Sequence, residues 1–100
     1  MPRFMVLYVG PATPPDASHE GWPAWFAGLG DRLIDRGSPL ASGFALRDDG
    51  PTGLGTTRVN GYSVVRADDT DELLDQLTNH PYLAPGGDHS IEVYLMPEPG

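Results

Sequence analysis

The stretch Trp22-Pro23-Ala24-Trp25-Phe26, continued by Leu29, Leu33 and Ile34, decides how this chain folds. Its large apolar side chains from Trp22 to Leu33 recur at positions i, i+3, i+4, i+7 and i+11, which predicts a helix with one apolar stripe. A protein of 100 residues that places this much aromatic surface on one face must cover it. The cover is either the protein's own sheet or a ligand.

The ends of this helix are indicated by proline and glycine. Pro23 is tolerated only in a first turn, so we expect the helix to begin between Ser18 and Trp22. Gly37 followed by Pro39 is typical of a helix C-terminus, so we expect the helix to end there.

The N-terminal run Phe4–Val9 is continuously apolar and stops at Gly10-Pro11. A run of this length bounded by turn residues is typical of a strand that is buried on both faces. This strand would precede the aromatic helix. It is too short for a signal peptide and no small-residue cleavage site follows it, so we expect a cytoplasmic protein.

The middle of the chain predicts an antiparallel hairpin. Leu40–Leu46 is a weak strand, Asp48–Gly55 is a flexible turn region, and Tyr62–Ala67 is a strand with alternating faces. Gly50, Gly53 and Gly55 are spaced somewhat like a phosphate-binding loop, but no helix follows to hold an anion. We interpret them as the tip of the hairpin.

The last third predicts a second helix and a final strand. Asp69 and Glu72 have the spacing of a capping box at the helix N-terminus, and Pro81 stops the helix near Asn79. The final strand is Ser90–Met96. The expected buried stripe of the helix consists of Leu73, Leu74 and Leu77.

The predicted order is β-α-β-β-α-β within one domain, residues 1–100. Right-handed crossovers turn this order into an α+β fold, a four-stranded antiparallel sheet with both helices on one face. The first strand is apolar on its far side too, which the chain itself cannot cover. We therefore expect a homodimer in which two sheets pack face to face.

Composition excludes some partners. The formal net charge is −8, and the six basic residues are all arginines scattered along the chain. Nucleic acids and anionic membranes need clustered positive charge, so we expect neither as a partner. The chain has no cysteine, which rules out thiolate chemistry and disulfides.

Four segments of the chain are similar to the YCII-related family of small proteins. They are FMVLYVGP, W-x-x-WF-x-x-LGDRLIDRG-x-P, GYSVVRADDTDELL and HPYL…SIEVYLMP. The resemblance implies the ferredoxin-like fold in its dimeric α/β-barrel form. The chain looks closer to the DGPF-like branch, although Asp49-Gly50-Pro51 is followed here by Thr52 and not by phenylalanine.

Some YCII-type proteins carry a histidine on the first helix paired with an aspartate, suggested as a catalytic dyad. The corresponding place in this chain holds Trp25-Phe26, and the nearest histidine is His19. Asp48 and Asp49 both lie where the acidic partner would be sought. The resemblance therefore implies the fold more strongly than the dyad chemistry.

The candidate site is an aromatic cleft between the helices and the sheet. His80 and Asp31 are the candidate groups for proton transfer. For the aromatic residues the other interpretation is core packing, for His80 helix termination, and for Asp31 a solvated helix face. His19 and His89 are more typical of loop residues. The predicted ligand-binding side chains are Tyr8, Trp22, Trp25, Phe26 and Tyr62.

No metal or cofactor is expected. Asp16, His19 and Glu20 lack the helical i, i+4 spacing that directs two ligands to one ion. Three functional hypotheses follow: a small cofactor-independent enzyme acting on an apolar or aromatic molecule, a non-catalytic dimeric module that binds a metabolite or a protein, and a structural dimer whose aromatic stripe is simply core.

Overall fold

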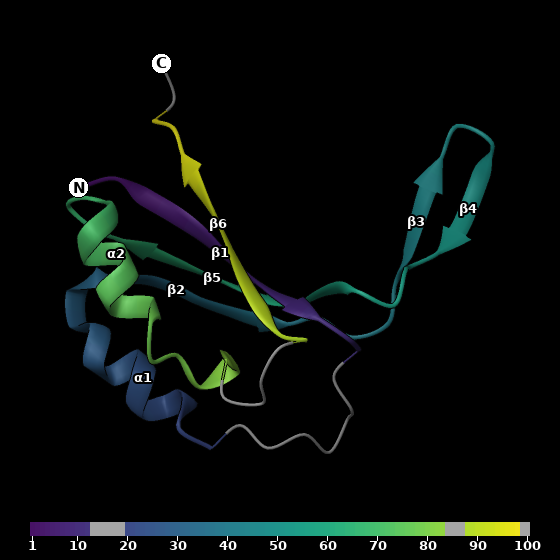
Figure 1. Cartoon of the computed structure of the whole chain (residues 1–100). Helices are drawn as coiled ribbons and strands as arrows, with labels where there is room; N and C mark the ends of the chain where they lie inside the picture. Colours follow the sequence, from purple (N-terminus) through teal and green to yellow (C-terminus); the bar gives the residue numbers. More distant parts are fainter. Residues whose placement is uncertain (13–19, 84–87, 99–100) are drawn as a thin grey trace.

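The computed structural model describes residues 1–12, 20–83 and 88–98 (Figure 1). No helix in these ranges is long and apolar enough to cross a membrane. Two short 3-10 turns, η1 (Gly30–Arg32) and η2 (Pro81–Leu83), follow the two helices. The helices and strands are β1 (Arg3–Gly10), α1 (Trp22–Leu29), β2 (Leu33–Pro39), β3 (Phe44–Arg47), β4 (Gly50–Gly53), β5 (Arg58–Arg66), α2 (Thr70–Leu77) and β6 (Ser90–Met96).

The main sheet of the described residues has four strands in the order β2-β5-β1-β6. All of its neighbouring strands run antiparallel. With one helix in each crossover, the chain is an α+β protein, and its topology is compatible with the predicted ferredoxin-like fold. The central strand β1 is bonded on both sides, which agrees with its apolar sequence.

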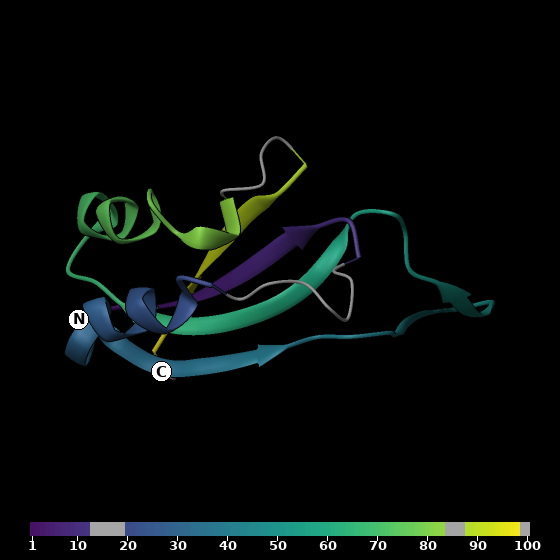
Figure 2. The ribbon, with the colours of Figure 1, turned by 90° about the horizontal axis from the view of Figure 1, so that it is seen from below.

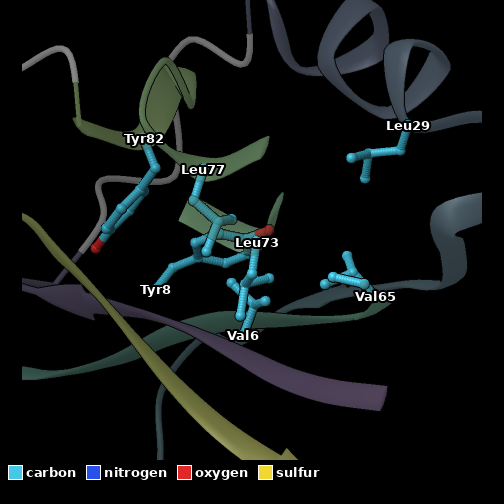
Figure 3. Packing of buried hydrophobic residues seen from close by; sticks show 8 residues of the cluster. Val6, Tyr8, Leu29, Val65, Leu73, Leu77 and Tyr82 are labelled. Atoms are coloured by element: carbon cyan, nitrogen blue, oxygen red, sulfur yellow. The ribbon is translucent and has the colours of Figure 1, made fainter. Parts of the chain in front are cut away.

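Both helices pack on the same face of this sheet (Figure 2). Leu29 of α1 and Leu73 and Leu77 of α2 belong to one buried cluster with Val6 and Val65 of the central strands (Figure 3). Alternation along the strands therefore decides which side chains form the core. Ser63, Val65 and Ala67 share this face and are completely buried.

The first helix is much shorter than predicted. It ends at Leu29, and Leu33 and Ile34 belong to β2, so the predicted end at Gly37 is wrong. The i, i+4 spacing of Leu29 and Leu33 fits a helix, but Leu33 pairs with Val65 across the sheet and packs on the core from there. Gly37 is inside the strand with φ of 76°.

The predicted weak strand Leu40–Leu46 is also misplaced. Because β2 starts early, β2 is the strand that pairs with β5, through Pro39 opposite Gly61. A separate two-stranded hairpin follows, in which β3 overlaps the end of the predicted strand and β4 lies within the region predicted as a turn. This hairpin projects away from the helices and the main sheet (Figure 1), and its Phe44 and Leu46 are 71% and 75% exposed.

The predicted start of the second helix is confirmed. The Glu72 backbone N–H donates to the Asp69 carboxylate at 2.9 Å, and the Glu72 carboxylate accepts from the Asp68 N–H at 2.9 Å. The buried stripe differs in one residue, because Leu74 is 57% exposed. The final strand has the predicted bounds, Ser90–Met96.

Gly37 should tolerate no side chain. A Cβ there would overlap the Tyr62 carbonyl oxygen, and the positive φ is unfavourable for any residue with a Cβ. We expect Gly37→Ala to lower the free energy of unfolding by about 2–3 kcal/mol in urea titrations. Gly28→Ala is the matched control: nothing lies within 4 Å of its Cβ position, so we expect a gain of up to about 1 kcal/mol. Equal effects of the two substitutions would contradict this assignment.

Candidate functional site

Three of the predicted aromatic residues surround His80, the candidate proton-transfer group. The ring centroid of His80 lies 4.0 Å from that of Trp25, 4.6 Å from that of Trp22 and 4.9 Å from that of Tyr8. Only 2% of His80 is exposed. We call His80, Tyr8, Trp22, Trp25 and Tyr82 the aromatic cluster.

Four segments bring this cluster together, and one of them is η2, which supplies Tyr82. The N-terminus of α1 supplies the tryptophans, and Gly21 lies so close to η2 that a Cβ there would be 3.5 Å from Pro81 Cβ. The turn after α2 supplies His80, whose N–H donates to the carbonyl of Leu77, the last residue of α2, at 3.0 Å. Tyr8 comes from the central strand β1, with its ring centroid 5.3 Å from that of Tyr82.

The protonation of His80 follows from its hydrogen bonds. Its Nδ1 lies 2.9 Å from the Tyr82 backbone nitrogen, which is a donor. Nδ1 must therefore be the unprotonated nitrogen, and the neutral ring carries its proton on Nε2. That proton points to the Tyr8 hydroxyl, 3.1 Å away.

The remaining protons of this chain of hydrogen bonds are also determined. The Ser63 hydroxyl donates to the Arg36 carbonyl at 2.7 Å, and a carbonyl can only accept. Ser63 must then accept from Tyr8, whose hydroxyl is 2.8 Å away. Every hydrogen bond of this chain is therefore donated in the same direction: His80 donates to Tyr8, Tyr8 to Ser63, and Ser63 to the backbone of β2.

These bonds and the burial keep the cluster neutral. Burial lowers the pKa of His80 to about 4, because the charged ring would lose its hydration. Burial also raises the pKa of Tyr8 to about 12, partly offset by its bond to Ser63. At neutral pH the single lone pair of His80 is already bound to a backbone N–H, so this ring has no free site for a ligand's proton.

The other predicted site residues lie outside this cluster or at its edge. Asp31 is exposed, and its carboxylate lies 3.9 Å from the Arg66 guanidinium. Tyr62 pairs with Leu7, so it lies on the opposite face of the sheet from Tyr8. Phe26 is at the edge, with its ring centroid 5.3 Å from that of Trp25 and the Arg36 guanidinium 4.7 Å above its ring.

Part of the aromatic cluster reaches the surface. Trp22 and Trp25 of the cluster are half-buried, as is Phe26 beside them, and we call these three residues the aromatic rim. The Trp25 indole N–H is already satisfied, since it donates to the Gln76 carbonyl at 2.9 Å. Beside His80 there is an open depression of about 270 Å³, which is lined by Thr78, Asn79, His80, Pro81 and Leu83.

Sequence reasoning missed three residues of the site. Ser63 carried a signal, because it is a polar residue on a strand face otherwise formed by Val65 and Ala67. No sequence pattern indicated Tyr82 or Asn60. In the structure, the Asn60 amide donates to the Tyr82 hydroxyl at 3.1 Å and to the Pro11 carbonyl at 2.7 Å. These contacts join segments that are far apart in the sequence.

The remaining histidine and aspartate candidates are His19, His89, Asp16, Asp48 and Asp49. Asp16 and His19 lie outside the described residues. His89 is half-buried, with its ring centroid 5.0 Å from that of Tyr82. Asp48 and Asp49, the candidates for an acidic dyad partner, are exposed in the turn of the β3–β4 hairpin.

His80 should make the protein acid-sensitive. Between pH 6.5 and about 4 the unfolded chain binds a proton at this residue and the folded chain does not. The free energy of unfolding should therefore fall as the pH falls through this window, by up to about 3 kcal/mol from His80 alone. Above pH 6.5 this residue contributes no pH dependence.

Urea titrations at pH 7 and pH 4 test this contribution. His80→Gln keeps one acceptor and one donor but cannot titrate, so its stability should fall less on acidification than that of the wild type. His89→Gln is the matched control and should retain the wild-type fall. The assignment is wrong if both variants fall as much as the wild type.

We compared the chain with protein-family models, with curated proteins and with solved structures, and none of them matches it. The resemblance to the YCII-related family therefore stays a prediction from the four sequence segments. The functional conclusions depend on the geometry of this chain's own residues.

Proposed function

We propose that this protein is a non-catalytic homodimeric module that binds a small apolar or aromatic molecule on the aromatic rim. The observation that carries this proposal is the bond between His80 Nδ1 and the Tyr82 N–H. It occupies the lone pair that a general base would need. The site therefore has aromatic surface for binding a ligand, but the hydrogen bonds of its histidine stabilise the fold and leave it no acceptor for a substrate proton.

The separation of the two candidate catalytic groups also favours binding over acid–base catalysis. General acid–base catalysis requires a group within hydrogen-bond reach of the reacting atom. Asp31 is 83% exposed and lies beside Arg66, whereas His80 is enclosed by the tryptophans. Asp31 and His80 are therefore not positioned to act on the same substrate.

The chemistry of the aromatic rim favours a neutral, flat ligand. The Trp25 N–H is bound to the Gln76 carbonyl, so this side chain offers its ring face and not a donor. Asn79 in the neighbouring depression supplies a polar side chain that can orient a ligand, whereas the Thr78 hydroxyl already donates to the Leu74 carbonyl at 2.6 Å. A net charge of −8 disfavours anionic ligands.

A thermal-shift screen of neutral aromatic and apolar metabolites tests the proposal, with tryptophan emission followed for each compound that stabilises the protein. A ligand at about a hundred times its Kd should stabilise the fold by about 2.7 kcal/mol. We expect Trp25→Leu to weaken binding about tenfold or more, because it removes a stacking surface. Phe44→Leu, on the hairpin, is the matched control and should bind like the wild type.

Two outcomes would contradict the proposal. If a compound binds without any change in tryptophan emission and with equal affinity to Trp25→Leu, the site is elsewhere. If a bound compound is converted to product and His80→Gln abolishes the conversion while retaining binding, the protein is an enzyme and His80 takes part in the reaction.

A further inference from the structure

Three polar side chains lie together at one end of the main sheet, on the face that carries the helices. Arg58 of β5 pairs with Gly10 of β1, so Arg58 projects from the face toward which a Cβ of Gly10 would point. Such a Cβ would be 3.1 Å from the Tyr82 hydroxyl and 3.6 Å from the Cα of His89, the residue before β6. Gly10 therefore lets this hydroxyl approach the sheet between the strand of Arg58 and His89. We call Arg58, Tyr82 and His89 the polar triad.

Two members of the polar triad carry buried nitrogens that bind nothing. In the part of the chain that the structure describes, three buried side-chain polar atoms lack a hydrogen-bond partner, and two of them are Arg58 Nε and His89 Nδ1. The described ion pairs involve Arg32 and Arg66, so the guanidinium of Arg58 has no carboxylate beside it there. Arg58 is thus a half-buried positive charge without a counter-charge from the described residues.

The Tyr82 hydroxyl supplies a third donor. Its oxygen accepts from the Asn60 amide at 3.1 Å, and no group in the described ranges accepts its own proton. This hydroxyl points away from Leu73 and Val65 of the core (Figure 3). The ring of His89 packs against that of Tyr82, with the centroids 5.0 Å apart. The phenol proton and the His89 ring therefore lie at the same end of the sheet.

The polar triad requires a partner that accepts hydrogen bonds. Buried polar groups in folded proteins are almost always paired, so donors left over in one place indicate a partner from outside the chain. A water molecule accepts only two hydrogen bonds and brings two protons of its own. A carboxylate only accepts, has about four lone pairs, and neutralises one guanidinium. It can bind Arg58 Nε–H, the Tyr82 O–H and His89 in the tautomer that carries its proton on Nδ1.

The charge of the surroundings favours a singly charged group. Arg58 balances one negative charge, and a doubly charged phosphate would remain anionic in a protein of net charge −8. The exposed Asp88 precedes His89 and adds a further negative charge. More distant carboxylates act weakly on a group in contact with Arg58, because salt screens charges beyond about 8 Å.

We infer that Arg58, Tyr82 and His89 bind the carboxylate of a small molecule at this end of the main sheet. The inference goes beyond the proposed function, whose neutral ligand lies on the aromatic rim. Tyr82 contributes to the two regions through different groups. Its backbone N–H binds His80, and its hydroxyl belongs to the polar triad.

Titration with sodium acetate tests the inference, because acetate is the smallest stable carboxylate after formate. The arginine Nε–H signals are followed by proton–nitrogen NMR at pH 6.5, with sodium chloride at the same ionic strength as reference. The signal of Arg58 is identified by its loss in Arg58→Leu. We expect this signal to shift with acetate and to saturate, and that of Arg47, which is exposed on the hairpin, not to saturate.

Thermal unfolding of variants shows whether the polar triad is responsible. Acetate should raise the Tm of the wild type above its value in chloride, and this excess should be lost in Arg58→Leu and retained in the matched control Arg47→Leu. Without acetate, Arg58→Leu should unfold at or above the wild-type Tm, because it removes a buried donor that is unpaired.

Tyr82→Phe tests the third donor and serves if Arg58→Leu does not fold. It removes only the hydroxyl, and the Asn60 amide keeps its bond to the Pro11 carbonyl. We expect acetate binding about tenfold weaker, the size of effect typical of a hydrogen bond to a charged group. Trp25→Leu on the aromatic rim should bind acetate like the wild type.

Each contrary result overturns a stated part of the inference. The site is refuted if acetate gives no saturable shift of Arg58, or if Arg58→Leu and Tyr82→Phe both bind acetate as the wild type does. Tighter binding of phosphate than of acetate at equal ionic strength overturns the assignment to a singly charged carboxylate. Loss of acetate binding in Trp25→Leu overturns the separation from the aromatic rim, whose own ligand is tested independently by the screen of neutral compounds.

Discussion

The backbone N–H of Tyr82 fixes the chemistry of the whole region beneath the helices. By donating to His80 Nδ1 it determines which ring nitrogen carries the proton, and that proton determines the direction of the bonds through Tyr8 and Ser63. The chain of bonds ends on the backbone of β2. One backbone amide therefore links a helix end, two central strands and an edge strand, and each polar group inside is satisfied only while the others stay in place.

This constraint explains why aromatic residues gather around a histidine that is not free to react. A neutral imidazole has a polar edge that must be satisfied and two apolar faces that can be packed. The edge is satisfied by Tyr8 and the Tyr82 amide, and Trp25 and Trp22 pack around the rest of the ring. Burial of a polar side chain in this form costs little, because none of its hydrogen-bonding groups is left unpaired.

The parts of the fold that depend on short-range pattern could be predicted from the sequence. The Asp69–Glu72 cap and the bounds of the final strand, Ser90–Met96, depend on near neighbours, and both are as predicted. The boundary between α1 and β2 could not be predicted, because Leu33 fits a helical period equally well. Pairing with Val65, a residue far along the chain, decides in favour of a strand.

The sequence indicated which residues form the site, but not how they contact one another. The aromatic residues and His80 could be named, but the state of His80 depends on a backbone amide and on two hydroxyls from separate strands. Tyr62 illustrates the same limit. Its side chain was expected beside Tyr8, and the sheet register, which no local pattern specifies, places it on the other face.

The β3–β4 hairpin and the rest of the described chain contribute differently to the stability of the fold. Phe44 and Leu46 point their apolar surface to solvent, so folding gains almost nothing from them. A substitution beneath the helices acts on whether the protein folds at all. A substitution in the hairpin changes a surface that the folded protein presents to other molecules. The hairpin can therefore change in length or chemistry while the main sheet and the two helices keep their fold.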